Sequence, residues 1–246
     1  MITSFRRRLV AALFAVAAAG CASSAQAPDY QALVASPDRS DADRTNDVRR
    51  KPAQFLAFYG IRPGMTVADL DAAGGYTTEL LARAVGPAGR VYAQNTQETL
   101  VRIKNSFAER AQKPVMGQVV HVVRPFDDPL PPEARNLDLV TFNFGYHDTT
   151  YQSVDRDKMN RAVFNALKSG GLYVVADHSA RAGSGVGVGK SLHRIEEAAL
   201  QREIEAAGFR LVAEGGFLRN PNDPRDASVF KPSQPNDEFV LKFVKP

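Results

Sequence analysis

Two pairs of neighbouring polar residues in this 246-residue chain have side chains suited to proton transfer or metal binding: His147-Asp148 and Asp177-His178. Each pair stands at or just after the end of an apolar run, LDLVTFNF for the first and LYVVAD for the second. An imidazole titrates near neutral pH, so His147 or His178 could act as a general base. Alternatively, Asp148, Asp177 and His178 offer the oxygen and nitrogen ligands of a divalent metal. The third interpretation is that both histidines are hydrogen-bonded turn residues.

The other two histidines are weaker candidates. His193 lies on the apolar side of a predicted helix, where packing is the more common role, and His121 lies inside a predicted strand. The segment Arg181–Ser191 ends in Gly-Lys-Ser, but a phosphate-binding P-loop needs glycine five residues before that unit, and Ser184 stands there. Two interpretations are left for this segment, a mobile lid over a ligand site and a plain flexible loop.

A second group of candidate residues forms a loop of small residues, DLDAAGGY, which begins at Asp69 and follows the apolar run MTVA. Small residues let the backbone approach a ligand, and a helix that starts directly after them presents free N–H groups. Tight turns between strands and helices also need glycine for steric reasons alone. The loop is therefore a weak signal by itself.

Short apolar strands alternate with amphipathic helices from about residue 46 onward, and this pattern must position the candidate residues. The expected strands are Met65–Asp69, Arg90–Ala93, Gln118–Val123, Leu137–Phe144, Leu172–Asp177, Phe209–Glu214 and Phe239–Val244. The expected helices are Thr77–Val85, one from an N-cap at Asn95 to Arg110, Arg156–Lys168 and Leu192–Ala207.

No helical pattern separates the last two strands, so we expect a long hairpin that makes one terminal strand antiparallel. The alternation otherwise predicts an α/β fold with a doubly wound, mostly parallel, seven-stranded sheet. Such sheets bind their ligands beyond the carboxyl ends of the strands. The small-residue loop and both polar pairs stand at those ends.

These segments, in this order, resemble the class I S-adenosylmethionine-dependent methyltransferases. The small-residue loop resembles the first motif of that family, GRVYAQN its second strand, and RPFDDPLP the loop that contacts adenine. LDLVTFN and ALKSGGLYVVAD resemble the fourth and fifth strands, and EIEAAGFRLVAE the last helix and sixth strand. The resemblance covers residues 46–246 and implies a Rossmann-like methyltransferase fold with S-adenosylmethionine as the methyl donor.

The resemblance also implies which residues surround the cofactor. Its ribose would lie at Asn95, which is equally suited to cap a helix, and its adenine at Asp127 or the neighbouring Asp128. The family usually has three glycines in its first motif, where this chain has Asp71, Ala73 and Gly75. Asp71 could pair with the amino group of the cofactor or obstruct its binding. The full predicted set is Asp69, Asp71, Gly74, Gly75, Asn95 and Asp127.

In this interpretation the protein methylates an unidentified small molecule, and His147 and His178 remove the acceptor's proton or position the acceptor. The metal alternative at Asp148, Asp177 and His178 is similar to metal-dependent O-methyltransferases of this fold, but it is not favoured. A different class of function is also open, because two of the three motif glycines are absent. The fold could serve as an exported, non-catalytic protein that binds a nucleoside-like ligand.

Composition excludes several other classes. With 44% hydrophobic and 24% charged residues, the chain resembles a soluble globular protein rather than a disordered or multi-pass membrane protein. Its net charge of +4 depends on Arg6–Arg8; without them 28 basic residues face 27 acidic ones, a net of +1. We therefore expect no nucleic-acid partner.

The first 20 residues have the pattern of a secretory signal, with Arg6–Arg8 before the apolar run LVAALFAVAAAG. Ala-Ala-Gly-Cys21 resembles a bacterial lipobox, which predicts a lipid anchor on Cys21; ordinary cleavage after Ala27 is the alternative. We expect an exported protein, periplasmic or anchored to the outer membrane of a bacterium. Residues 21–45 are expected to be a tether or flexible arm, and residues 46–246 the folded domain.

Overall fold

The computed structural model describes residues 27–246 except residue 231. The predicted signal segment and Cys21 therefore lie outside the described residues. Among the helices that are described, none is both long and apolar enough to span a lipid bilayer.

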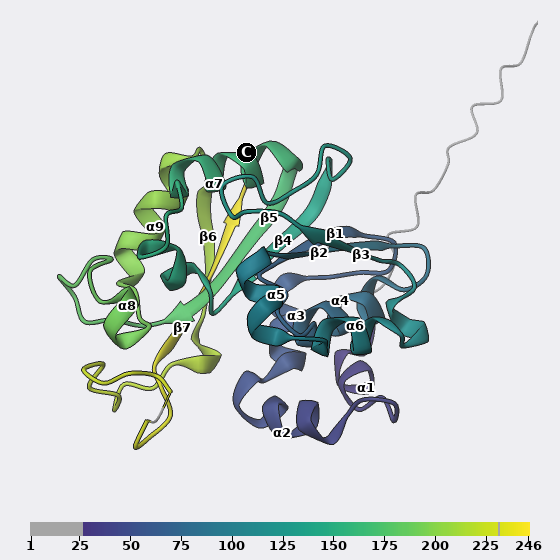
Figure 1. Cartoon of the computed structure of the whole chain (residues 1–246), viewed down its shortest axis with the longest axis horizontal. Coiled ribbons are helices and arrows are strands. Elements are labelled where there is room, and N and C mark those ends of the chain that lie inside the picture. Colours follow the sequence, from purple (N-terminus) through teal and green to yellow (C-terminus); the bar gives the residue numbers. More distant parts are fainter. Residues whose placement is uncertain (1–26, 231) are drawn as a thin grey trace, which may run out of the picture.

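Seven strands form one twisted sheet in the order β3-β2-β1-β4-β5-β7-β6 (Figure 1). The strands from β3 to β5 in this order are parallel, whereas β7 runs antiparallel to both β5 and β6. The predicted mostly parallel sheet and its C-terminal hairpin are thus confirmed. The strands are β1 Thr66–Leu70, β2 Arg90–Asn95, β3 Val119–Val123, β4 Leu137–Asn143, β5 Leu167–His178, β6 Arg210–Gly215 and β7 Glu238–Val244.

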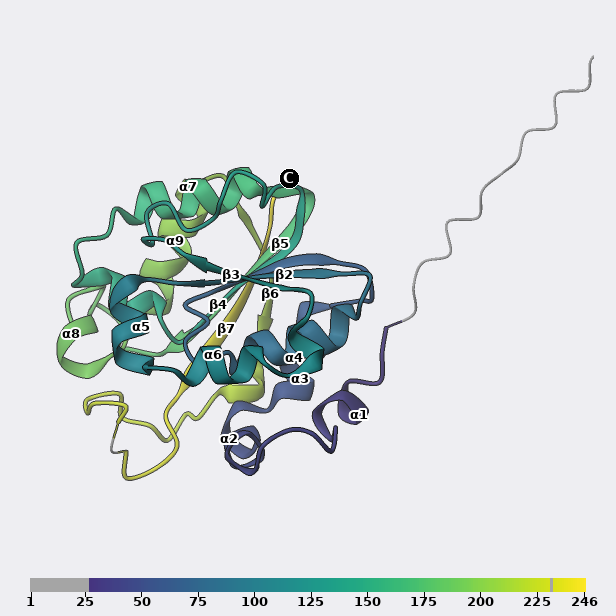
Figure 2. The same cartoon turned by 45° about the vertical axis from the view of Figure 1, so that its right-hand side comes forward.

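Helices cover both faces of this sheet (Figure 2). Successive strand residues alternate between two cores: Val67 and Leu139 pack with helices α3, α4 and α6, whereas Ala68 and Val140 pack with α7 and α9. This alternation follows from the period of two along a strand. The bounds are α3 Pro52–Tyr59, α4 Tyr76–Val85, α6 Ser106–Ala111, α7 Arg156–Ala166 and α9 Glu197–Ala206.

The expectation of a tether over residues 21–45 is wrong for residues 30–45, which form helices packed on the domain. They contain α1 (Tyr30–Val34) and the start of α2 (Asp41–Arg50). The Tyr30 hydroxyl donates to the Ile61 carbonyl, and the buried Asp43 binds Arg110 of α6. Apolar periodicity misses α2 because its contacts are ionic, and its acidic first turn and basic last turn suit the helix dipole.

Two predicted helices are each interrupted by a residue in the left-handed region. Lys104, at φ 53°, separates α5 (Gln97–Ile103) from α6, and Thr96 rather than Asn95 caps α5. His193, at φ 52°, separates α8 (Gly189–Leu192) from α9. The short 3-10 helices are η1 Pro114–Met116, η2 Tyr146–Thr150 and η3 Gly216–Leu218.

Candidate functional site

A cavity of about 780 Å³ lies at the carboxyl ends of the central strands. Its walls come from the first loop, α5, η2, the end of β5 and the long β6–β7 connection. A second cavity, of about 610 Å³, lies between the first loop, α2 and α6. The two cavities share Arg50, Asp71, Arg102 and Phe144, so they adjoin at the first loop.

The first loop keeps a backbone path that favours glycine although two of its three glycines are replaced. Asp71, Ala73 and Gly75 have φ angles of 47°, 46° and 82°, and they are the three positions at which the methyltransferase motif usually has glycine. A non-glycine residue in the left-handed region costs about 1–2 kcal/mol. Such a conformation persists only where the surroundings hold it in place.

Side chains at the end of β2 hold this loop. Gln94 accepts a hydrogen bond from the Asp71 N–H at 3.0 Å. The Asn95 side chain accepts from the Ala73 N–H at 2.8 Å and donates to the Ala73 carbonyl at 3.3 Å. Asn95 is fully buried, so the structure gives it a role in positioning the loop. Its predicted contact with the cofactor ribose stays a prediction.

Asp69, at the end of β1 just before the loop, is buried beneath it. Its carboxylate is buried and accepts hydrogen bonds from the hydroxyls of Thr78 on α4 and Thr141 on β4, at 2.6 and 2.9 Å. Burial raises the pKa of Asp69 to about 6, although both hydroxyls oppose the shift. Asp69 lines neither cavity, so it ties β1 to its neighbours rather than facing a ligand.

Asp71 is the predicted cofactor residue that faces both cavities. One carboxylate oxygen accepts from the Thr99 hydroxyl at 2.9 Å, and the other lies 3.7 Å from the Arg102 guanidinium. Burial raises the pKa of Asp71, and Arg102 and Thr99 counteract that effect. Gly74 lines the second cavity, whereas Gly75 is the residue before the first turn of α4.

The structure does not bring Asp127 to either cavity. Its carboxylate pairs with the Lys158 ammonium of α7 at 3.2 Å, and Asp128 pairs with Arg124. Phe126, the preceding residue, lines the larger cavity instead. The segment RPFDDPLP therefore lies at the edge of the sheet that the sequence predicted. Its apolar residue Phe126, rather than the predicted Asp127, faces the cavity.

His147 is held between two carboxylates at the cavity wall. Its Nδ1 lies 2.7 Å from Asp177 Oδ1, and its Nε2 lies 3.1 Å from Asp148 Oδ1. Burial lowers the pKa of His147, but Asp177 and Asp148 outweigh that effect and raise it to about 10. The imidazole is therefore cationic at neutral pH. A protonated ring opposes the predicted role of His147 as a general base, and that role stays a prediction.

His178 keeps the role that the sequence predicted for it as a candidate base. It lines the cavity, and its Nδ1 lies 3.0 Å from Glu238 Oε1, at ion-pair distance but outside the geometry of a hydrogen bond. Arg49 donates to the same oxygen at 2.9 Å. Among the described residues, Nε2 of His178 forms no hydrogen bond. A carboxylate beside one ring nitrogen leaves the other available to a bound acceptor.

His193 joins this site, although the sequence indicated a packing role. Its Nδ1 lies 3.3 Å from Asp148 Oδ1, and its ring packs against Phe230. Gly189 allows this approach, because a Cβ there would lie 2.8 Å from the His147 carbonyl oxygen. The predicted metal set of Asp148, Asp177 and His178 is not assembled. Instead, His147, Asp148 and His193 each offer one potential ligand atom, and these three atoms lie within 4.8 Å of one another.

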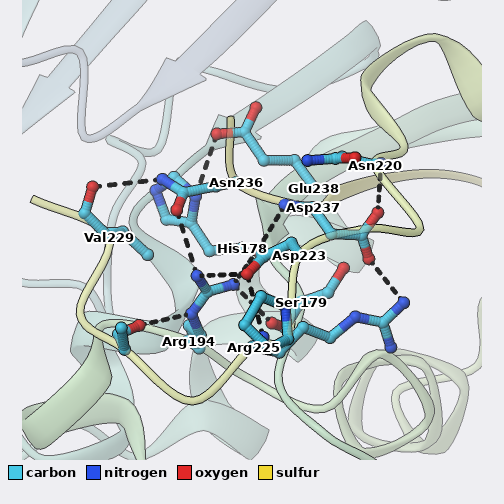
Figure 3. A network of polar contacts seen from close by, with 12 residues as sticks. His178, Ser179, Arg194, Asn220, Asp223, Arg225, Val229, Asn236, Asp237 and Glu238 are labelled. Carbon is cyan, nitrogen blue, oxygen red and sulfur yellow. Dashed lines mark hydrogen bonds and ion pairs between the residues drawn. The ribbon is translucent and has the colours of Figure 1, made fainter. Parts of the chain in front are cut away.

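The β6–β7 connection covers the larger cavity, and a buried arginine anchors it (Figure 3). Arg194 donates to Asp223 at 2.8 Å and to Asn236 at 3.1 Å, both within this connection. No residue of Arg181–Ser191, for which a mobile lid and a plain flexible loop were the two interpretations, lines the cavity. The covering residues, which the sequence did not indicate, are Val229, Phe230, Pro232, Pro235 and Asn236.

Comparisons with known proteins agree with this architecture. Residues 48–186 match the ubiE/COQ5 methyltransferase family. Over 120 residues the chain is 31% identical to the ubiquinone/menaquinone biosynthesis C-methyltransferase UbiE of Hydrogenovibrio crunogenus, covering 49% of this chain and 44% of the relative. The corresponding Escherichia coli K12 protein is 30% identical over 120 residues, covering 49% and 45%. The matches thus span less than half the length of these curated relatives.

Two solved structures share the fold at low identity. A SAM-dependent methyltransferase from Aquifex aeolicus aligns with a TM-score of 0.59 at 18% identity, covering 85% of this chain and all of that one. An arsenic(III) S-adenosylmethionine methyltransferase from Chlamydomonas reinhardtii aligns with a TM-score of 0.56 at 17% identity, covering 90% and 74%. Because the family match includes more than half of the chain, this protein belongs to the ubiE/COQ5 methyltransferase family, whose methyl donor is S-adenosylmethionine.

Proposed function

We propose that the protein transfers a methyl group from S-adenosylmethionine to a small molecule bound in the larger cavity. The observation that carries this proposal is the pair of adjoining cavities, which meet at Asp71 of the first loop. The smaller cavity has the backbone and charged groups that suit the donor. The larger cavity has the size and aromatic lining of a small-molecule site.

The smaller cavity suits the donor because of the groups that line it. Ala72, Gly74 and Thr77 place it against the first loop and the start of α4, where free N–H groups favour negative charge. Arg50 adds a guanidinium to both cavities, 4.2 Å from the Phe144 ring centroid. Burial lowers the pKa of Arg50 to about 10, so it stays cationic at neutral pH and can bind the donor's carboxylate.

The larger cavity suits a planar acceptor, since Phe126, Phe144, Tyr151 and Phe230 line it. In the proposed step an acceptor lone pair attacks the methyl carbon, and the electrons of the broken carbon–sulfur bond stay on sulfur. S-adenosylhomocysteine is thereby released, and the acceptor proton passes to Nε2 of His178.

Calorimetric titration with S-adenosylhomocysteine and S-adenosylmethionine tests the donor half of this proposal. We expect one site per chain, and binding about tenfold weaker in Arg50→Met because a charged hydrogen bond is lost. Arg161→Met is the matched control, because Arg161 is exposed and forms only a weak ion pair, at 4.0 Å, with the exposed Asp157. An absence of heat at millimolar ligand would refute the methyltransferase activity.

A screen of phenolic and other planar acceptors with methyl-labelled donor tests the acceptor half. We expect His178→Gln to reduce kcat for a methylated acceptor while the affinity for S-adenosylhomocysteine stays unchanged. Unchanged kcat would remove His178 as the base.

We also propose that the protein is exported and anchored through a lipid on Cys21. The support is the basic and apolar pattern of residues 1–20 and the Ala-Ala-Gly-Cys sequence that ends it. Methyl transfer would then require a supply of the donor outside the cytosol. Membrane fractionation of cells that express the full chain tests the location.

A further inference from the structure

We propose that His147, Asp148 and His193 bind a divalent transition metal of the zinc type at the wall of the larger cavity. This proposal rests on the proposed function for its role in catalysis, but the metal site itself does not depend on it. The chain has four histidines, and two of them converge on one carboxylate here.

The two histidine nitrogens lie at distances from the Asp148 carboxylate that fit a tetrahedral site, and the three ligand atoms all lie within 4.8 Å of one another. Nε2 of His147 lies 3.1 Å and Nδ1 of His193 lies 3.3 Å from Oδ1 of Asp148. In a tetrahedral zinc site with metal–ligand bonds of about 2.0–2.1 Å, neighbouring ligand atoms are about 3.3 Å apart. Little movement of the side chains is therefore needed to admit the ion.

A buried carboxylate orients the first of these ligands. Asp177, which is fully buried, binds Nδ1 of His147 at 2.7 Å and also accepts from the His147 backbone N–H at 2.8 Å. This interaction directs Nε2 toward Asp148. Carboxylates behind metal-binding histidines commonly play this part, because they fix the ring's orientation and raise its basicity.

The local fold supplies the other two ligands from separate elements. Asp148 lies on η2, and His193 ends α8 after Gly189 has allowed close packing against η2. All three ligands line the larger cavity. Three protein ligands leave a fourth position open, as in catalytic rather than structural zinc sites.

The open position assigns a chemical class to the acceptor. A hydroxyl or enol oxygen that enters it would be acidified by the cation. His178, the proposed base, belongs to the same cavity, and its ring centroid lies 5.7 Å from that of His147. We therefore expect acceptors with an ionisable oxygen rather than an amine.

Zinc titration of chelator-treated full-length protein tests the site. The parent for all variants carries Cys21→Ala, because Cys21 is the only thiol and could bind zinc itself. We expect one Zn²⁺ per chain in competition with a chromophoric chelator, and the visible absorption of four-coordinate Co²⁺ on substitution. Asp148→Asn and His193→Gly should each bind at least tenfold more weakly, and Asp177→Asn 10–100-fold more weakly.

The choice of variants separates metal binding from loss of the fold. Glycine suits the backbone of His193, which has φ 52°, so His193→Gly should keep the parent's melting temperature in the absence of metal. His121→Gln removes a histidine of β3 and should leave zinc affinity unchanged. Failure to bind one zinc ion, or equal affinity in the parent and His193→Gly, would overturn the proposal. Binding of S-adenosylhomocysteine is measured separately, so either proposal can fail alone.

Discussion

Replacing Arg110 by methionine should uncouple helix α2 from the first loop. Arg110 donates to the Gly74 carbonyl at 2.7 Å, to both oxygens of Asp43 at 2.7 and 2.9 Å, and to Glu79. Asp43 and Glu79 have side chains only 4% and 1% exposed. Glu79 retains Arg83 and Lys113 as partners, whereas Asp43 keeps no other ion pair among the described residues. The substitution therefore leaves one buried carboxylate uncompensated.

The expected loss in free energy of unfolding is about 3 kcal/mol, the lower end for breaking a buried ion pair, because Glu79 stays paired. Burial raises the pKa of Asp43, but its hydrogen bonds to Arg110 outweigh this effect and the net shift is downward. A lowered folded-state pKa contributes stability above the unfolded pKa of about 4, and that contribution is lost as the pH falls through the folded value. The difference in free energy of unfolding between the parent and Arg110→Met should thus become smaller below pH 4.

Urea unfolding at several pH values between 3 and 7 measures this gap. The exposed Arg161 provides the control, since Arg161→Met should change stability by less than about 0.5 kcal/mol. Adding Asp43→Asn to Arg110→Met should recover part of the loss, because the stranded charge is removed. A loss below 1 kcal/mol, or a gap that is the same at pH 3 and pH 7, would refute the reasoning.

Three further predictions concern single residues. Ala73→Gly should stabilise the protein by about 0.5 kcal/mol in urea unfolding, because relief of the left-handed strain exceeds the added chain entropy, whereas Ala72→Gly should destabilise it. Burial raises the folded-state pKa of Asp69 to about 6, so the free energy of unfolding of the parent should fall by about 2 kcal/mol as the pH rises from 4 to 6. Asp69→Asn should flatten that profile, and an unchanged slope would contradict this prediction. Cys21→Ala should release the full chain from membranes, and unaltered fractionation would favour ordinary signal cleavage.

The mostly parallel sheet and the C-terminal hairpin could be predicted because they depend on local patterns. Apolar runs such as LYVVAD have the length and composition of buried strands, and a chain with alternating helices has few ways to connect them. The first loop was located by its small residues even though Asp71 and Ala73 replace glycines. Its unusual backbone is maintained by Gln94 and Asn95, a contact between neighbouring strands that no local pattern reveals.

Other parts of the site depend on contacts between distant segments. Helix α2 has no apolar face, so hydrophobic periodicity could not detect it, and its ion pair with Arg110 joins residues 67 positions apart. The sequence indicated Asp127 or Asp128 as the cavity residue of its loop, and only the direction of that loop shows that Phe126 lines the cavity instead. His193 was assigned to a helix face because its left-handed backbone is not visible from residue type.

The sequence by itself determined the doubly wound sheet, its methyltransferase-like order of segments and the strand ends at which polar residues gather. The sheet and its strand ends follow from periodicity and from the restricted topology of parallel strands, whereas the order of segments was identified by its resemblance to the methyltransferases. Only the tertiary structure decided the roles of these residues. It placed two carboxylates on His147, which makes that imidazole a cation, and left Nε2 of His178 free of hydrogen bonds within the described chain. Burial and charge act across space, so a histidine's protonation depends on neighbours that sequence separation conceals.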